Sequence, residues 1–164
     1  IAVSAIPLSD HDGDGLLLMP ASYEWHHGVA EVVGSGDPRP GQRQRIRLAR
    51  LDAVVVEPMR VGVMKLDVEG HEAQVLRGAE ALLTGHRVRD VVYEDHAHYP
   101  TAVSRLLEDR GYVVFGVGST FWGPSLTPAA GPTHVPGWES PSYLATVEPD
   151  RARMRLARRG WRVL

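Results

Sequence analysis

Five ionisable side chains are clustered between positions 65 and 72, at the end of a short apolar run in the middle of the chain. They are Lys65, Asp67, Glu69, His71 and Glu72. Carboxylates, an imidazole and an ammonium at this spacing can bind hydroxyl groups or transfer protons. In open α/β sheets, ligands bind at the carboxyl ends of the strands, where a turn of this kind lies. The cluster is therefore a candidate functional site.

A second polar cluster follows the apolar run Val88–Tyr93 and contains Glu94, Asp95, His96 and His98. Imidazole titrates near neutral pH, and a neighbouring carboxylate can orient it. His96 is therefore the first candidate for a general base, and Glu94 is the second. Lys65 could pair with Asp67 or with Glu94 and hold the acidic groups together.

The elements that must position these clusters alternate between strands and helices. Strands are predicted at Ile1–Leu8, Leu16–Met19, Arg43–Leu51, Val61–Leu66, Val88–Tyr93, Tyr112–Val117 and Ser142–Val147. Because right-handed crossovers join parallel strands, this order predicts an α/β fold with a mostly parallel sheet and both clusters at one edge. Ser119–Pro141 is predicted to be a loop, and the segment that begins at Pro149 a short basic helix.

Length, composition and charge limit the possible classes. The chain has 164 residues, of which 43 % are hydrophobic, so a single domain over 1–164 is expected, with 149–164 as a basic tail. The formal charge of -2 and the lack of a long apolar run argue against nucleic acid and membrane partners. Cysteine is absent, so a cytoplasmic location is the default. Lys65 is the only lysine of the chain. Its place beside the acidic turn has two alternative explanations, chance or a chemical requirement for lysine.

Several other interpretations were weighed for the same residues. Asp10, Asp12 and Asp14 match half of a calcium loop, but Ala21 stands where the bidentate Glu belongs, which favours a solvated turn. His71 cannot belong to a zinc motif H-E-x-x-H, because Val75 replaces the second histidine. Glu72 stands where a helix begins, which favours a structural role. A site in which Asp67, Glu94 and His96 bind one divalent ion remains an alternative. The aromatic side chains of the loops Tyr23–His27 and Phe121–Trp138 could stack on a flat ligand or a sugar ring, or could anchor the loops to the core.

The segment M-K-L-D-V-E-G-H-E-A-Q-V-L-R-G-A, residues 64–79, resembles the FkbM-type methyltransferase family. Leu51 and Asp52 ahead of it, and a strand that ends in Glu94 and His96 behind it, extend the likeness. The segment S-A-I-P-L-S-D, residues 4–10, resembles the end of the third strand in that family. The resemblance implies a Rossmann-like fold and transfer of a methyl group from S-adenosylmethionine to a hydroxyl of a sugar, glycan or polyketide-like metabolite.

The resemblance also implies roles for individual residues. Ser9, Asp10, Asp67 and Glu69 are expected to bind the cofactor. Lys65, Asp67, Glu94 and His96 are expected to serve catalysis, with a small-molecule or glycan hydroxyl as the acceptor; no residue is assigned as a metal ligand. The alternative from a different class is a non-catalytic α/β binding module, or a metal-dependent hydrolase, that uses the acidic crevice.

One part of the family pattern is missing from this sequence. The family has a first strand with a glycine-rich turn and a second strand with an acidic residue for the ribose, and neither is found here. An amino-terminally truncated class I methyltransferase sheet is therefore expected, with weak or no cofactor binding by these residues alone. Ile1–Leu8 is then expected either to pair with Val61–Leu66 or to separate from the core.

Overall fold

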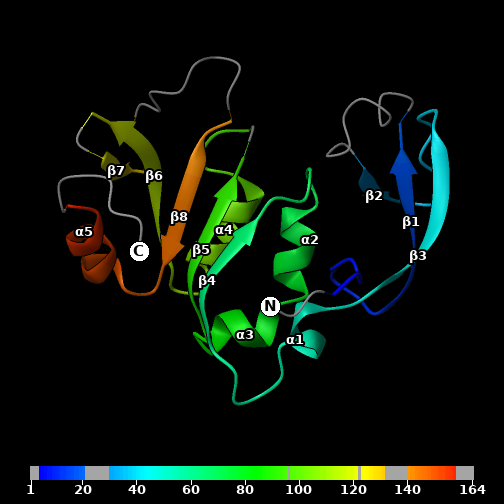
Figure 1. Ribbon diagram of the computed structural model, residues 1–164, viewed down its shortest axis with the longest axis horizontal. Coiled ribbons are helices and arrows are strands. Elements are labelled where there is room, and N and C mark those ends of the chain that lie inside the picture. The colour runs from blue at the N-terminus through cyan, green and yellow to red at the C-terminus, as the bar shows by residue number, and fades with distance from the viewer. Residues whose placement is uncertain (1–3, 21–29, 96, 122, 132–139, 158–164) are drawn as a thin grey trace. The chain divides into compact units, whose positions relative to one another are not determined.

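The computed structural model describes residues 4–20, 30–95, 97–121, 123–131 and 140–157. These residues form two compact units (Figure 1). The first unit contains the chain up to Pro58 together with Val68–Ala81, and the second contains Met59–Asp67 and the chain from Leu82 onwards. The sequence predicted a single domain over 1–164.

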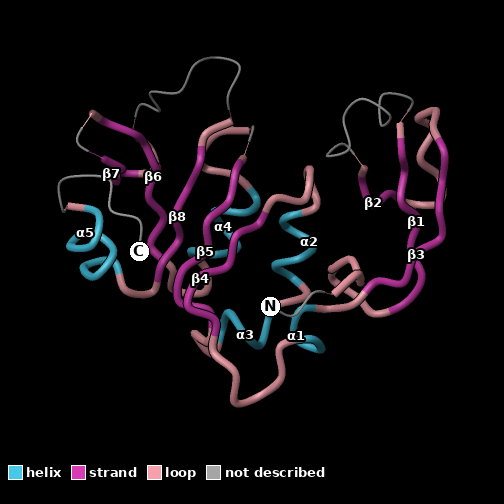
Figure 2. Tube along the Cα trace, viewed as in Figure 1, coloured by secondary structure: helices cyan, strands magenta, loops and turns pink. Residues whose placement is uncertain are grey.

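The first unit contains a small antiparallel sheet with the strand order β2-β1-β3 (Figure 2). Its elements are β1 (Gly13–Met19), β2 (Glu31–Val33), β3 (Gln42–Leu48), α1 (Leu51–Val54), α2 (Glu72–Arg77) and the start of α3 (Glu80–Thr84). The predicted strand at Leu16–Met19 is confirmed, and β3 is an edge strand, as its arginines indicated. The apolar side chains of Leu18 and Leu48 are buried on this sheet.

The predicted strand at Ile1–Leu8 is wrong for the described residues 4–8. Leu8 forms an isolated parallel bridge with Ala49. The Ser9 N–H donates to the Ala49 carbonyl at 2.9 Å, and the Ala49 N–H donates to the Pro7 carbonyl at 3.1 Å. Pro7 has no N–H to extend a ladder, so the pairing stops there. In the described part of the chain this segment does not pair with Val61–Leu66.

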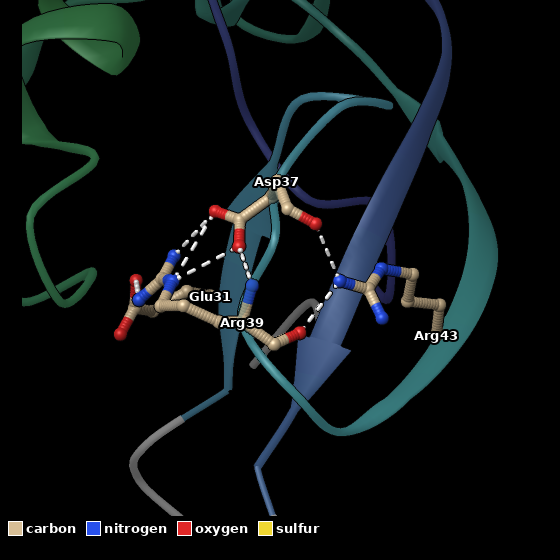
Figure 3. A network of polar contacts seen from close by, with 4 residues as sticks. All are labelled: Glu31, Asp37, Arg39 and Arg43. Atoms are coloured by element: carbon tan, nitrogen blue, oxygen red, sulfur yellow. Dashed lines mark hydrogen bonds and ion pairs between the residues drawn. The ribbon is translucent and has the colours of Figure 1, made fainter.

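The loop between β2 and β3 is held by arginine side chains (Figure 3). The Arg39 guanidinium donates to Glu31 Oε2 at 2.8 Å and to both Asp37 carboxylate oxygens at 3.0–3.2 Å. The Arg43 Nη2 donates to the carbonyls of Asp37 and Arg39, both at 2.7 Å. Arg43 therefore has a structural role in this loop.

The second unit is built on a five-stranded mixed sheet with the order β4-β5-β8-β6-β7 (Figure 2). Its elements are β4 (Val61–Leu66), β5 (Val88–Glu94), α4 (Ala102–Glu108), β6 (Val113–Thr120), β7 (Gly123–Pro128), β8 (Ser142–Thr146) and α5 (Pro149–Leu156), together with the end of α3. The predicted α/β class is confirmed, and so is the basic helix at Pro149. None of the helices in the described ranges is long and apolar enough to cross a membrane.

The expectation of a mostly parallel sheet is not confirmed. The pair β4/β5 is parallel, whereas β5/β8, β8/β6 and β6/β7 are antiparallel. The reason is the place of β8, which lies between β5 and β6 and runs against both. Strands β4, β5 and β6 therefore still point in one direction, with a reversed strand inserted among them.

Part of the segment predicted as the loop Ser119–Pro141 is a strand. β7 forms a hairpin with β6 in which Thr120 lies opposite Gly123. Pro124 and Pro128 suggested a loop, but β7 is an edge strand, where a residue without an N–H is tolerated. Phe121 in the hairpin turn is 88 % exposed, and its predicted companions Trp122, His134 and Trp138 lie outside the described residues, as do Tyr23–His27.

Helix α4 begins directly after the second polar cluster. Thr101 Oγ1 accepts a hydrogen bond from the Ser104 N–H at 3.3 Å, and Ser104 Oγ accepts one from the Thr101 N–H at 2.8 Å. This reciprocal capping satisfies two N–H groups that the first helical turn leaves without partners. Both residues are buried, so the end of the polar turn is fixed to the core.

Candidate functional site

The two parallel strands β4 and β5 bring members of both polar clusters together. Their register pairs Lys65 with Val92 and Leu66 with Tyr93. Asp67 follows Leu66, and Glu94 follows Tyr93, so the two carboxylates leave neighbouring strands at the same level. The prediction that the two polar turns meet at one carboxyl edge is confirmed for this pair.

Lys65 distinguishes the two carboxylates chemically. Its Nζ donates to Asp67 Oδ2 at 2.6 Å. The hydrogen bond and the charge of Asp67, followed by the charge of Glu94, raise the pKa of Lys65. The Glu94 carboxylate forms no hydrogen bond or ion pair with any residue that the structure describes. Asp67 is therefore neutralised by a partner, while Glu94 is available to a ligand.

His96 lies outside the described residues, but the turn on either side of it is well fixed. The Asp95 N–H donates to the Pro141 carbonyl at 3.1 Å, and Asp95 Oδ1 accepts from the Ala97 N–H at 2.9 Å. The Tyr99 N–H donates to the Tyr143 hydroxyl at 3.0 Å. The Asp95 carboxylate thus stabilises the backbone of the turn. The role of His96 as a base stays a prediction.

The acidic turn of the first cluster continues into α2 in the first unit. Glu72 Oε1 accepts from the N–H groups of Val68 and Gly70, each at 3.3 Å, which supports the structural role that the sequence suggested. Glu69 has a left-handed backbone with φ of 47°, which costs energy for a residue with a side chain. Its expected contact with the cofactor stays a prediction.

A pocket of about 720 Å³ lies within the first unit. It contains Ser9 and Asp10, which the resemblance assigned to the cofactor, and also His71, Gln74 and Arg45, which it did not. Leu16, Val32, Val33 and Leu48 add apolar surface to its walls. The volume is within the range of ligand pockets, roughly 300–1,000 Å³.

A short hydrogen-bond chain lines this pocket. Ser9 Oγ lies 3.0 Å from His71 Nε2 and 3.2 Å from Asp10 Oδ1. His11 Nδ1 lies 2.7 Å from the same Asp10 oxygen, and this hydrogen bond is the main cause that lowers the pKa of Asp10. Burial lowers the pKa of His71, so its imidazole is neutral at neutral pH. The pocket therefore offers an ionised carboxylate and a neutral imidazole, linked by a buried hydroxyl.

Sequence reasoning missed the contact between Ser9 and His71. His71 was interpreted as a turn residue, and 62 positions separate it from Ser9. Neither residue shows a local spacing pattern that would connect them. Only the family likeness at Ser9 pointed toward this part of the chain.

The half-buried imidazole of His71 makes the stability of the first unit depend on pH. Because the pKa of folded His71 is lowered from 6.5, its protonation opposes folding, and its stabilising contribution is lost as pH falls below 6.5. We expect His71→Gln to reduce the difference between the free energies of unfolding at pH 7.5 and 5.5, measured by urea titration. The control His98→Asn, which replaces an exposed imidazole, should leave that difference unchanged; an equal reduction in both variants would contradict the assignment.

The aspartates that resembled a calcium loop are paired with cations instead. Asp12 Oδ2 accepts from Arg50 Nε at 2.9 Å, and Asp14 Oδ1 accepts from Arg47 Nη1 at 3.2 Å. Within the described ranges, no group of three or more His, Cys, Asp or Glu residues is arranged to hold a metal ion. The suggested ion shared by Asp67, Glu94 and His96 includes a residue outside those ranges.

Asp52, ahead of the segment 64–79, and Gly78, within it, have structural roles in the first unit. Asp52 Oδ2 accepts from the Ala81 N–H at 2.8 Å, near the start of α3, and the Asp52 N–H donates to the Gly78 carbonyl at 3.0 Å. A Cβ on Gly78 would lie 1.9 Å from the Ser9 carbonyl oxygen. These residues hold the backbone of Ser9 against α2.

Comparison with known proteins indicates a family for this chain. The family model described as methyltransferase FkbM domain matches residues 6–114, which include both polar clusters and the pocket of the first unit. Searches of curated proteins and of solved structures gave no significant match. The matched range covers well over half of the 164 residues. The chain therefore belongs to the FkbM methyltransferase domain family.

Proposed function

We propose that this protein is an S-adenosylmethionine-dependent O-methyltransferase that acts on a hydroxyl of a sugar, glycan or polyketide-like metabolite. The observation that carries the proposal is the Glu94 carboxylate at the carboxyl edge of β4 and β5, beside the Lys65–Asp67 pair. The family membership supports methyl transfer, and the common direction of β4, β5 and β6 supports a Rossmann-like sheet.

For methyl transfer to a hydroxyl, the protein must align the cofactor with the acceptor and remove the proton of the acceptor hydroxyl. When bound, S-adenosylmethionine supplies an electrophilic methyl group; a C–O bond forms at the acceptor as the C–S bond breaks. Glu94 accepts a hydrogen bond from the acceptor hydroxyl, and His96 receives its proton. Asp67, held by Lys65, binds a further hydroxyl of the acceptor or cofactor.

The residues of the pocket fit part of the cofactor. Gln74 Oε1 is buried and has no hydrogen-bond partner among the described residues, so it can accept from a donor of a ligand. The Asp10 carboxylate and the Ser9 hydroxyl offer further hydrogen-bonding positions. A nucleoside carries hydroxyl and amino donors that suit this set. Ser9 and Asp10 would therefore bind the adenosyl part, and Glu69 remains a candidate at the adjoining turn.

The test is transfer of an isotopically labelled methyl group. The protein that carries these residues is incubated with methyl-labelled S-adenosylmethionine and a panel of sugars, oligosaccharides and hydroxylated polyketides. We expect label on an acceptor oxygen, identified by mass spectrometry as an O-methyl ether, together with release of S-adenosylhomocysteine. Label on nitrogen or carbon, or hydrolysis of an acceptor without methylation, would contradict the proposal.

A further inference from the structure

The pocket of the first unit has a polar part and an apolar part. Ser9, Asp10 and His71 form the polar part, in which the Ser9 hydroxyl contacts both other side chains. Leu16 and Val33 contribute apolar side chains. All of the residues that line the pocket belong to the first unit, so a ligand held by them needs no group from the second unit.

Three of the lining residues form one row across the small sheet, here called the sheet row. Leu16 on β1 lies opposite Val33 on β2 and opposite Arg45 on β3. Paired residues project their side chains from the same face of a sheet, and neighbouring strands lie about 4.8 Å apart, so the row is roughly 10 Å wide. Because all three residues line the pocket, the sheet row is a wall broad enough for a planar ring system.

Arg45 ends the sheet row with a guanidinium that has no partner in the described part of the chain. Its neighbours on the same face of β3 both have partners. Arg43 donates to two loop carbonyls (Figure 3), and Arg47 donates to Asp14. A guanidinium plane stacks on aromatic faces. Arg45 can therefore extend the apolar wall under a flat aromatic ligand.

Gln74 provides a hydrogen-bond acceptor in the same pocket. Its Oε1 atom is buried and has no partner among the described residues. Gln74 follows His71 by three residues, so the two side chains lie on one face of α2, about 4.5 Å apart along the helix axis. This acceptor therefore lies roughly one helical turn from the polar part at Ser9. The amide oxygen carries no net charge, so a neutral N–H donor suits it.

We propose that Gln74 makes the pocket selective for adenine among the purines, because Gln74 Oε1 accepts a hydrogen bond from the exocyclic amino group of the base. The inference rests on the proposed use of S-adenosylmethionine. In adenosine the amino group and the ribose lie at opposite ends of the base, so one ligand reaches both Gln74 and the polar part at Ser9 and Asp10. The base packs on the sheet row. Hypoxanthine and guanine have a carbonyl oxygen in place of the amino group, so two acceptors would face each other.

The experiment measures the binding of three uncharged probes by ligand-observed NMR, which detects weak complexes. The probes are adenosine, purine riboside, which lacks the amino group, and inosine, which has a carbonyl oxygen in its place. We expect the wild type to bind adenosine about 5- to 10-fold more tightly than either of the others, as for one buried hydrogen bond. Gln74→Met removes the acceptor with little change of volume, and it should bind adenosine and purine riboside with equal affinity.

Gln44→Met is the matched control, because Gln44 is an exposed residue of β3 that does not line the pocket. This variant should keep the full preference for adenosine. Arg45→Gln should weaken the binding of all three probes by a similar factor of about two to five, as for stacking at an exposed site. Arg47→Gln, which removes a charge already paired with Asp14, should change each affinity by less than about twofold. Retention of the wild-type circular dichroism spectrum excludes unfolding.

Three results would overturn the role of Gln74. They are equal affinities of the wild type for adenosine and inosine, an adenosine preference that survives in Gln74→Met, and binding of none of the three probes to the wild type. Transfer of the labelled methyl group is assayed separately. Transfer together with any of these three results would overturn only the role of Gln74. An adenosine preference that depends on Gln74, without transfer to any acceptor, would support the adenine site and refute the proposed O-methyltransferase function.

Discussion

Replacing Glu94 by glutamine is expected to lower kcat for methyl transfer by about 10²-fold, the lower end of the range for general acid–base groups, because the carboxylate that orients the acceptor hydroxyl is lost while His96 still receives the proton. Glu94 is exposed and makes no hydrogen bond or ion pair with a described residue, so the substitution removes no structural contact that the structure records. The free energy of unfolding should therefore change by less than about 0.5 kcal/mol. Steady-state kinetics and urea titration of the same preparation check the two expectations together.

His96→Gln separates the two candidates for the base. If His96 receives the proton, kcat of the wild type should rise with pH in the range where a histidine titrates, and His96→Gln should lose this pH dependence. Glu94→Gln should have a lower kcat at every pH but the same pH dependence as the wild type. The control is Asp109→Asn, which removes an exposed carboxylate at the end of α4 in the same unit. Turnover that is unchanged in both the Glu94 and the His96 variants would refute the assignment of this edge as the catalytic site.

The strands that carry Lys65, Asp67 and Glu94 could be predicted because their information is local. Each is a short apolar run that ends in polar residues, and a helical segment separates the two runs. A crossover of this length makes the strands parallel, which places the two polar turns at one edge. The ion pair between Lys65 and Asp67, two residues apart, was also within reach of sequence reasoning.

The antiparallel part of the fold depended on information that is not local. A final strand such as Ser142–Thr146 can be recognised by its composition, but its insertion between β5 and β6 follows from long-range pairing. β7 contains two prolines, which are typical of loops, and only its edge position makes them compatible with a strand. The periodicity of apolar residues predicts which side chains of a strand are buried, but it does not predict which other strand pairs with it.

The pocket of the first unit was missed for a related reason. Ser9, Arg45 and His71 come from three distant segments, and each is unremarkable in its local context. Arg45 belongs to a stripe of arginines that suggested a solvated edge, and the difference among the three appears only when their partners are known. A family resemblance could point to Ser9 and Asp10, but not to the residues that the fold brings beside them.

Gly78→Ala is expected to destabilise the first unit more than alanine at any other described glycine of that unit, because its added Cβ makes the shortest contact. Gly78 has φ of -71°, a helical conformation that alanine adopts readily, so the expected cost is entirely steric. Its Cβ would lie 1.9 Å from the Ser9 carbonyl oxygen and 3.0 Å from the Ser9 carbonyl carbon. Because both are backbone atoms, no side-chain rotation relieves the clash, and the backbone of Ser9 or α2 must move.

We expect this displacement to lower the free energy of unfolding by about 3 kcal/mol or more, the upper range for overpacking. The Ser9 and Ala49 amides hydrogen-bond the segment 7–9 to Ala49, and their hydrogen exchange should accelerate more than exchange at Val91 in the second unit. The control is Gly36→Ala, where an added Cβ meets no atom within 4 Å. Ser9 also forms the hydrogen bond to His71, so a displaced Ser9 should weaken ligand binding in the pocket of the folded fraction. Wild-type exchange rates at Ser9 and Ala49 in Gly78→Ala would contradict the close packing of Gly78 on Ser9.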